Sequence, residues 1–482
     1  MQLSIVFKTI GLLLMVFSLT QLPPILVDLI YAQQQYSIFL TAFFATFSIG
    51  LLLWFKFRKS KQDFRIREGI LVVVSFWFVL SLFATIPFLL SDALQMSFSD
   101  AFFESMSGLT TTGATVIVGL DDLPKAILYY RQQLQWLGGM GIIVLALAIL
   151  PMLGVGGMEL YHAESSGISK DRLMPKLTQT AKVLWLIYIS FTLACALGYY
   201  LAGMSVFDAI GHSYTTVAIG GFSTHDASIG YFDSVAVESV AVVFMFLAGI
   251  NFSLHFFVWR PNHINHYYRD SEFRTYVAFL SFLTVVISLY LINTGQYQSI
   301  FEAFRYGIFQ SVSMATTTGF ASTNFSAWTF MLPVLLIFSS FVGACAGSTG
   351  GGIKVVRVLL MFKLAAKEIK KFIHPNAQIN IKLNKCGVAE NTLISVWGFF
   401  SLYVIAFIFI MIALMLTGLD QVSSFSATAA SINNLGPGLG KVAANYGDIS
   451  DSAKWILSFS MLLGRLEILT LMALLHRAFW RF

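Results

Sequence analysis

Charged residues are scarce in this sequence, since Asp, Glu, Lys and Arg together make up only 11% of its 482 residues. Ordinary soluble domains contain about 25%. Hydrophobic residues reach 57%, and several apolar stretches have the ~20 residues with which an α-helix crosses ~30 Å of hydrocarbon. The shortage of charge excludes an ordinary soluble protein and predicts an all-α polytopic membrane protein surrounded by the lipid bilayer.

Signatures of enzymes and of nucleotide or metal sites are also missing. The three cysteines, at 195, 345 and 386, have neither the pairing pattern of disulfides nor the spacing of metal ligands. The run "GHSYT" at 211–215 lacks the G-x-S-x-G order of a nucleophile elbow. Lys354, after a glycine-rich stretch, is not followed by the Ser or Thr of a P-loop. We therefore expect no enzyme activity and no nucleotide site on this chain.

The positive charge is concentrated in a few connections between apolar stretches. Residues 56–67 contain six Lys or Arg, and residues 354–371 contain six more. The positive-inside tendency places these connections on the cytoplasmic face, and acidic connections such as the one with Asp100 and Glu104 on the outer face. Because the charge follows helix ends and not one soluble domain, it does not predict nucleic-acid binding.

Four acidic connections each contain a short helical run that ends in small polar residues and glycine, which indicates an internal repeat. They are "SDAFFESMSGLTTTGAT" at 99–115, "FDAIGHSYTTVAIGGFST" at 207–224, "FEAFRYGIFQSVSMATTTGFAST" at 301–323 and "SSFSATAASINNLGPGLG" at 423–440. The first and third both contain Thr-Thr-Thr-Gly, at 110–113 and 316–319, and the fourth is the loosest match.

The second repeat allows two registers. Alignment at Asp208 places Gly221 opposite Gly113, whereas counting back from Thr224 selects Gly220. The sequence favours Gly221 and leaves Gly220 open.

Each short run has about 12 residues and spans ~18 Å as a helix, which is half a membrane. Such a helix can enter from outside and return as an extended segment if its non-helical part faces protein or water. We predict four repeats of helix, pore helix and helix, at 68–158, 180–262, 273–372 and 390–482, after two helices within 1–60. Repeats of equal topology are related by an axis along the membrane normal. The prediction is a pseudo-fourfold arrangement of about ten transmembrane helices with both termini cytoplasmic.

The residues at the end of each pore helix suit a bare cation, which must exchange its water shell for fixed oxygens such as rings of backbone carbonyls. Glycine permits the backbone conformation that aims successive carbonyls at one axis. The C-terminal end of each pore helix adds partial negative charge. We predict a cation-binding filter formed by Thr111, Thr112, Gly113, Ile219, Gly220, Gly221, Thr317, Thr318, Gly319, Asn434, Leu435 and Gly436.

The run "GACAGSTGGGIK" at 343–354 interrupts an apolar stretch. The 38 residues at 328–365 would form a helix of ~57 Å, about twice the hydrocarbon thickness. A break there leaves irregular backbone at membrane depth, which is tolerated where it lines a cavity or is buried in protein. We predict a gating loop at 343–352 below the filter, with Gly343, Gly347, Ser348, Thr349, Gly350, Gly351 and Gly352 as gate residues. The alternative is a passive kink that eases packing.

Arg465 lies near the middle of the apolar stretch 455–475, where an ionisable residue is expensive and functional by default. Glu467, two positions away, does not share its helix face. Carbonyls of the loop, or the hydroxyls of Ser348 and Thr349, are candidate partners. A positive charge beneath a cation filter would oppose conduction until it moved, so we assign Arg465 to the gate. The alternative is a structural salt bridge to another helix.

These motifs together resemble the Trk/Ktr/HKT superfamily of potassium transporters, and most closely the bacterial Trk-type membrane subunits. The resemblance covers nearly the whole chain and rests on residues 110–113, 219–222, 316–320 and 434–438 and on the loop. It implies a potassium-conducting pore with one filter glycine per repeat, in the bacterial cytoplasmic (inner) membrane. It also implies a homodimer and a cytosolic TrkA-like ring of nucleotide-binding regulatory subunits.

Two positions bear on ion selectivity. In the sodium-selective plant relatives of this family the first filter glycine is replaced by serine, whereas Gly113 keeps glycine, which favours potassium. The fourth filter departs from the T-T-x-G pattern because it reads Asn433-Asn434-Leu435-Gly436.

The expected function is potassium uptake through a filter gated by the loop and by the cytosolic subunit. The alternatives are the potassium-binding subunit of a potassium-pumping ATPase and a symporter of potassium with protons or sodium.

Overall fold

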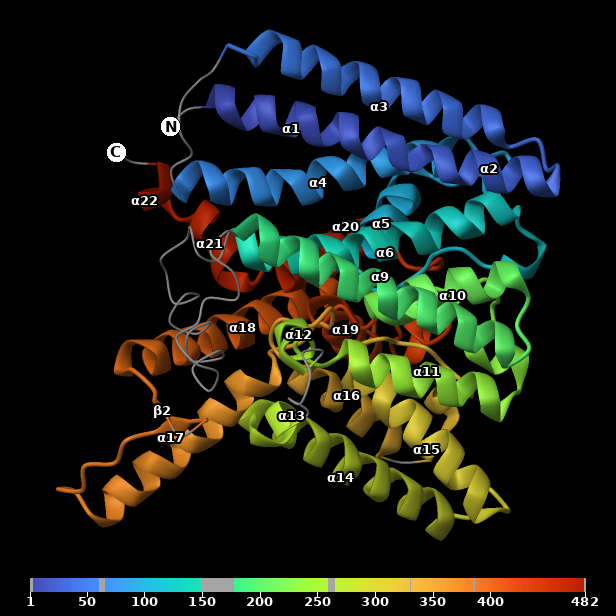
Figure 1. Ribbon diagram of the computed structural model, residues 1–482. Coiled ribbons are helices and arrows are strands. Elements are labelled where there is room, and N and C mark those ends of the chain that lie inside the picture. The colour runs from blue at the N-terminus through green and yellow to red at the C-terminus, as the bar shows by residue number, and fades with distance from the viewer. Residues whose placement is uncertain are drawn as a thin grey trace.

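The computed structural model describes residues 3–59, 66–148, 177–258, 265–329, 331–384 and 386–480. Within these ranges the chain is a bundle of helices (Figure 1). The strands found there are two short antiparallel ones, β1 (Lys382–Leu383) and β2 (Cys386–Gly387). The prediction of an all-α membrane protein is confirmed.

Two long helices precede the repeats. The first runs almost without a break through α1 (Leu3–Ser18), η1 (Leu19–Gln21) and α2 (Leu22–Tyr31), and α3 (Tyr36–Phe57) returns beside it. Gly11 and Gly50 lie where the two helices touch, and a Cβ on either would meet the backbone oxygen of the other. This close approach holds the pair together on one side of the bundle (Figure 1).

The remaining helices follow the predicted order of long helix, short pore helix and long helix. The first two groups are α4 (Ile66–Leu90), α5 (Phe98–Leu109) and α6 (Lys125–Ala148), then α9 (Leu177–Leu201), α10 (Val206–Ala218), α11 (Val235–Ala248) and α12 (Phe252–Val258). After α13 (Asn265–Arg269) come α14 (Ser271–Asn293), α15 (Ile300–Ala315), α16 (Leu332–Val342) and α17 (Val355–Ile373). The last group is α18 (Glu390–Leu416), α19 (Gln421–Ile432), α20 (Asp451–Arg465), α21 (Ile468–Leu475) and α22 (Arg477–Trp480). The predicted repeat boundaries stay predictions, and 149–158, 259–262 and 481–482 lie outside the described residues.

Each pore helix begins at an N-cap that the sequence provides. Ser97, Ser205 and Ser299 start α5, α10 and α15, and Asp420 starts α19. In each case the side-chain oxygen accepts a hydrogen bond from a backbone N–H of the first turn, which otherwise has no partner in a helix. The caps fix where the pore helices start, and therefore how deep their ends lie.

Several predicted spans are bent. Among the described residues, six helices are long and apolar enough to cross a bilayer, or eight if each of two bent pairs is one span. The apolar stretches 235–258 and 455–475 are broken by bends of 95° and 114°. The other two of the ten predicted crossings contain α6, with its buried polar residues at 131–135, and α16, an apolar helix of 11 residues.

One bend has a clear physical cause. Where α11 ends, Gly249 O accepts a hydrogen bond from Cys345 N, and Phe252 N donates to Gly347 O. The loop at 343–352 therefore provides hydrogen-bond partners for backbone groups that would pair within the helix if it were straight. This allows the helix to bend between α11 and α12.

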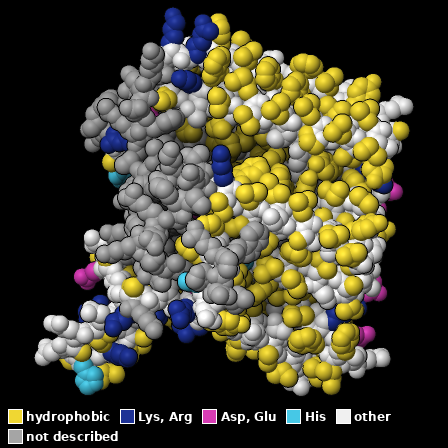
Figure 2. All heavy atoms as spheres, in the orientation of Figure 1, with side chains coloured by type: hydrophobic (Ala, Val, Ile, Leu, Met, Phe, Trp, Pro, Cys, Tyr) yellow, Lys and Arg dark blue, Asp and Glu magenta, His cyan; other side chains and the backbone are white. Residues whose placement is uncertain are grey.

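Acidic and basic side chains lie mostly towards opposite ends of the bundle. In Figure 2 hydrophobic side chains cover most of the right-hand part of the visible face, Asp and Glu lie mostly along its right edge, and Lys and Arg lie mostly towards the left. Both chain termini lie at the left end (Figure 1). The broad apolar surface is that of a protein embedded in lipid.

Candidate functional site

Four turns, one after each pore helix, have the same backbone conformation. We call them the filter turns: 110–113, 218–221, 316–319 and 433–436. Each ends in a glycine with positive φ, namely Gly113 (82°), Gly221 (81°), Gly319 (81°) and Gly436 (94°). Two residues earlier, each has a residue in the left-handed region, namely Thr111 (53°), Ile219 (55°), Thr317 (69°) and Asn434 (53°). Non-glycine residues rarely adopt that region. Its occurrence at the same position in all four turns shows that the turns are structurally equivalent.

The filter turns form a closed ring. A Cβ on Gly113 would overlap the carbonyl oxygen of Gly220 in the second turn. In the same way Gly221 lies against Thr318 O, Gly319 against Leu435 O, and Gly436 against Thr112 O. The order of contacts returns to its start, so the four turns surround one axis. Glycine is needed at each of these positions for two reasons: the positive φ disfavours other residues, and the neighbouring oxygen leaves no room for a Cβ.

The ring decides the register of the second repeat. Gly221, with positive φ, is equivalent to Gly113, while Gly220 occupies the place of Thr112, and its carbonyl oxygen belongs to the ring. The register that the sequence favoured is the one in the structure.

The fourth turn keeps the shared backbone although its sequence departs from the pattern. Asn434 has the φ of Thr111, and its Nδ2 donates to Thr112 Oγ1 at 2.9 Å and to Met461 O at 3.0 Å. In the first and third turns, paired threonine hydroxyls provide the support, at 2.8 Å between Thr110 and Thr112 and at 2.8 Å between Thr316 and Thr318. Amide hydrogen bonds replace hydroxyl ones, and the geometry is preserved.

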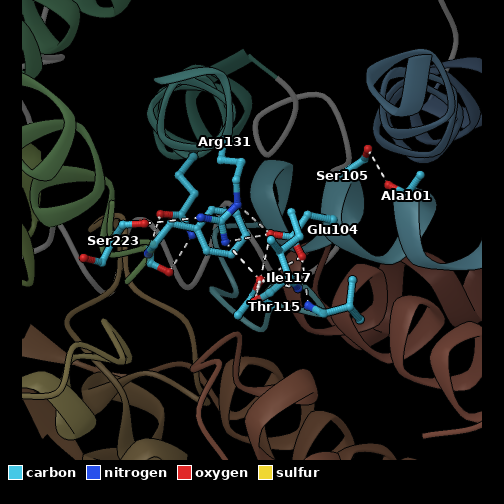
Figure 3. Close-up of polar contacts among 11 residues, drawn as sticks. Ala101, Glu104, Ser105, Thr115, Ile117, Arg131 and Ser223 are labelled. Atoms are coloured by element: carbon cyan, nitrogen blue, oxygen red, sulfur yellow. Dashed lines mark hydrogen bonds and ion pairs between the residues drawn. The ribbon is translucent and has the colours of Figure 1, made fainter. Parts of the chain in front are cut away.

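A buried ion pair lies next to the chain that follows the first turn. The sequence analysis did not predict it. Arg131 of α6 and Glu104 of α5 are 2.8 Å apart and inaccessible to solvent. Arg131 also donates to Thr115 Oγ1 at 3.0 Å and to Ser223 O at 3.2 Å, beyond the second turn (Figure 3). The prediction that the connection with Glu104 faces the outer side stays a prediction, but the Glu104 side chain itself is buried. A charge inside an apolar helix such as α6 was the available signal.

The glycine loop, residues 343–352, lies directly against the ring and the ends of the pore helices. Gly351 N donates to Thr317 Oγ1 at 2.7 Å, and Gly352 N donates to Asn433 O at 3.2 Å. Thr349 Oγ1 donates to Val217 O at 2.9 Å. The loop therefore touches the ends of three pore-helix segments; its role as a gate stays a prediction.

The interior of the loop is a series of tight turns. Gly343, Gly347 and Gly352 have positive φ, and a Cβ on Gly350 or Gly351 would meet backbone oxygen of a pore-helix end. Ser348 Oγ donates to Cys345 O at 2.6 Å, so its hydroxyl acts within the loop. Glu272 of α14 accepts hydrogen bonds from Ala346 N inside the loop, at 2.7 Å, and from Val356 N just after it, at 3.1 Å.

Arg465 is the last residue of α20 and is buried. Its Nη1 donates to Thr349 O at 3.1 Å, so a loop carbonyl is one of its partners, and its Nη2 donates to Gly138 O at 3.2 Å. No carboxylate pairs with Arg465 in the described part of the chain. Glu467 pairs instead with Arg357 at 2.8 Å.

Comparisons with known proteins agree with this geometry. Residues 35–479 match the family model of TrkH, described as a cation transport protein. The chain is 52% identical to the Trk system potassium uptake protein TrkH of Vibrio parahaemolyticus and 50% identical to that of Escherichia coli K12, with 100% of each chain covered in both comparisons. The crystal structure of the potassium transporter TrkH from Vibrio parahaemolyticus matches with a TM-score of 0.93 at 50% identity over 100% of both chains.

Proposed function

Since this chain belongs to the TrkH family of cation transport proteins, we propose that it carries potassium into the cell through the ring of filter turns. Membership in a transport family confirms the prediction that the chain is not an enzyme. The observation that carries the proposal is the closed ring, in which four carbonyl oxygens from four repeats meet around one axis.

The ring acts by replacing water. A potassium ion that enters loses its hydration shell, and backbone oxygens compensate for the loss only if they are held in place. The twelve predicted filter residues supply these oxygens. The pore helices point their C-terminal ends at the same region, where partial negative charge stabilises a cation. Asn434, Tyr446 and the threonine pairs hold the backbone through hydrogen bonds.

The glycine loop is the gate in this proposal. Four hydrogen bonds hold it against the pore-helix ends and Arg465. At about 1 kcal/mol for a neutral bond and about 2 kcal/mol for a charge-assisted one, releasing the loop costs about 5 kcal/mol. A change of this size turns a pore that is almost always closed into one that is almost always open. The binding energy of a protein partner can provide it.

The proposed orientation places the basic end, with both termini, in the cytoplasm of a bacterial inner membrane. In that orientation α17, with Lys370 and Lys371 in its last turn, extends from the bundle on the cytoplasmic side (Figure 1). A TrkA-like nucleotide-binding ring and a second copy of this chain are the proposed partners, on the strength of the family resemblance.

The test is ion flux into liposomes that contain the purified protein, with potassium or sodium as the only cation, and with or without the cytosolic partner. We expect potassium flux to exceed sodium flux and to rise when the partner is added. Equal flux of the two ions would remove the basis for a potassium filter.

The same liposomes distinguish the alternatives. A potassium-pumping ATPase subunit would depend on a pump partner and ATP hydrolysis. A symporter would move potassium only together with protons or sodium, and so against a potassium gradient when a proton or sodium gradient is imposed. The proposed pore follows the potassium gradient alone.

A further inference from the structure

The second filter turn is held by a side chain from another repeat. Gln135 of α6 is completely buried. Its Nε2 donates a hydrogen bond to Gly220 O at 2.6 Å, and its Oε1 accepts one from Phe222 N at 3.0 Å. The two bonds lie on either side of Gly221, so the amide of Gln135 bridges the filter glycine.

The residue before the filter glycine explains why this bridge is needed. The first and third turns carry threonine pairs that support their own backbone. In the second turn the corresponding residues are Ala218 and Gly220, which have no hydroxyl. A Cβ on Gly220 would overlap the amide of Gln135. The φ of Gly220 is not positive, so the backbone conformation does not require glycine there. The lack of a side chain instead makes room for Gln135.

Two consecutive glycines make the peptide between Gly220 and Gly221 the least restricted one in the ring, because neither residue has a Cβ to limit rotation. A rotation of that peptide would turn Gly220 O away from its neighbours. The hydrogen bond from Gln135 holds this oxygen, and the bond to Phe222 N holds the chain beyond it. A carbonyl oxygen has two lone pairs, so one stays available to an ion.

We propose that Gln135 is a positioning residue that determines ion selectivity at the second filter turn. This inference rests on the proposed function and adds a specific asymmetry to it. Among the ring oxygens Thr112 O, Gly220 O, Thr318 O and Leu435 O, all within the described residues, only Gly220 O accepts a side-chain hydrogen bond. One of the four ring oxygens is therefore held directly by a side chain from a neighbouring repeat.

The test replaces Gln135 by methionine, which has a similar length but neither donor nor acceptor, and by alanine, which leaves room for water. For both variants we expect the ratio of potassium to sodium flux in liposomes to fall about three- to tenfold, the effect of one or two net hydrogen bonds. The alanine variant keeps the test possible if the methionine variant does not fold.

Gln133 provides a matched control on the same helix. It is also buried, but its Nε2 donates to Thr20 O at 2.9 Å, on the N-terminal helix and away from the filter. Gln133→Met should leave the flux ratio as it is in the unaltered protein. An equal loss of selectivity in Gln133→Met would mean that α6 acts through general packing, which overturns the proposal.

A rescue variant tests the mechanism directly. In Gln135→Ala/Ala218→Thr/Gly220→Thr the second turn acquires the threonine pair of the first and third, in the space that the glutamine leaves. We expect this triple variant to recover most of the lost ratio. A folded Gln135→Met protein with an unchanged ratio would overturn the proposal, whereas a parent protein that passes both ions equally would overturn the proposed function itself.

Discussion

Arg465 donates a hydrogen bond to the carbonyl oxygen of Thr349 at 3.1 Å, which joins the end of α20 to the middle of the glycine loop. Arg465 is the last residue of α20, and the chain bends by 114° between α20 and α21. In the proposed gate, the contact with Thr349 helps to hold the loop closed.

The first prediction concerns this contact. Arg465→Met keeps the volume but removes a charge-assisted hydrogen bond worth about 1.5–3 kcal/mol, so the loop should leave the pore-helix ends more often. We expect potassium flux without a cytosolic partner to rise about tenfold. The rise is measured as potassium flux into liposomes. Arg58→Met, at the end of α3, is the control and should leave the flux unchanged. A folded Arg465→Met protein with unchanged flux would separate Arg465 from gating.

The second prediction concerns the filter glycines. Gly113→Ser introduces a side chain that would overlap Gly220 O at a residue with φ of 82°, so the ring must distort. We expect the ratio of potassium to sodium flux to fall about tenfold or more. Gly119→Ser is a matched control, because Gly119 also has positive φ, at 73°, but nothing lies within 4 Å of its Cβ position. A similar loss in both variants would attribute the effect to backbone strain alone.

The third prediction concerns the loop. Deleting residues 347–352 removes the hydrogen bonds to Val217, Thr317 and Asn433, and we expect basal potassium flux to rise. Thr349→Val, which removes the hydroxyl bonds to Val217 O and Ala248 O, should raise it about two- to fivefold. Ser348→Ala is the control, since that hydroxyl bonds within the loop. A folded deletion variant without increased flux would favour a passive kink.

The fourth prediction concerns stability. Arg131→Leu leaves Glu104 buried without its partner, which costs about 3–5 kcal/mol. Thermal unfolding in detergent should show a clearly lower midpoint. In Glu104→Gln/Arg131→Leu no charge remains to be buried, so most of the loss should be recovered. A double variant as unstable as the single one would show that packing, and not the unpaired charge, dominates.

The fifth prediction concerns pH. The His225 ring lies in the connection after the second filter turn, stacked on Tyr231 and facing the carboxylates of Asp121 and Asp208. Burial lowers the pKa of His225, but hydrogen bonds to Asp208 and Asp121 outweigh it, and the net pKa is raised. The charged ring therefore stabilises the fold fully below its unfolded pKa of about 6.5, and this contribution is lost as pH rises through the folded value.

His225→Asn measures that contribution. The variant should unfold at a lower temperature than the parent protein at pH 6, and the difference should shrink at pH 9. A difference that stays constant between the two pH values would mean that the ring's charge does not matter and that stacking on Tyr231 does.

Much of the fold was predictable because the signals are local. Apolar length predicts the spanning helices, and glycine after a short helix indicates a turn with positive φ. The break at 343–352 followed from the glycine run and from the length of the apolar stretch around it. Each of these rules depends on a few neighbouring residues.

The sequence by itself therefore determined the helices, the position of the turns and the need for a partner for Arg465. The tertiary structure alone decided the pairing of Glu104 with Arg131, the bridge from Gln135 and the bends in 235–258 and 455–475. The physical reason is distance along the chain: Gln135 and Gly220 are 85 positions apart, and Arg465 and Thr349 are 116 apart. Contacts between residues so far apart exist only when packing brings the helices together, and no local pattern records them.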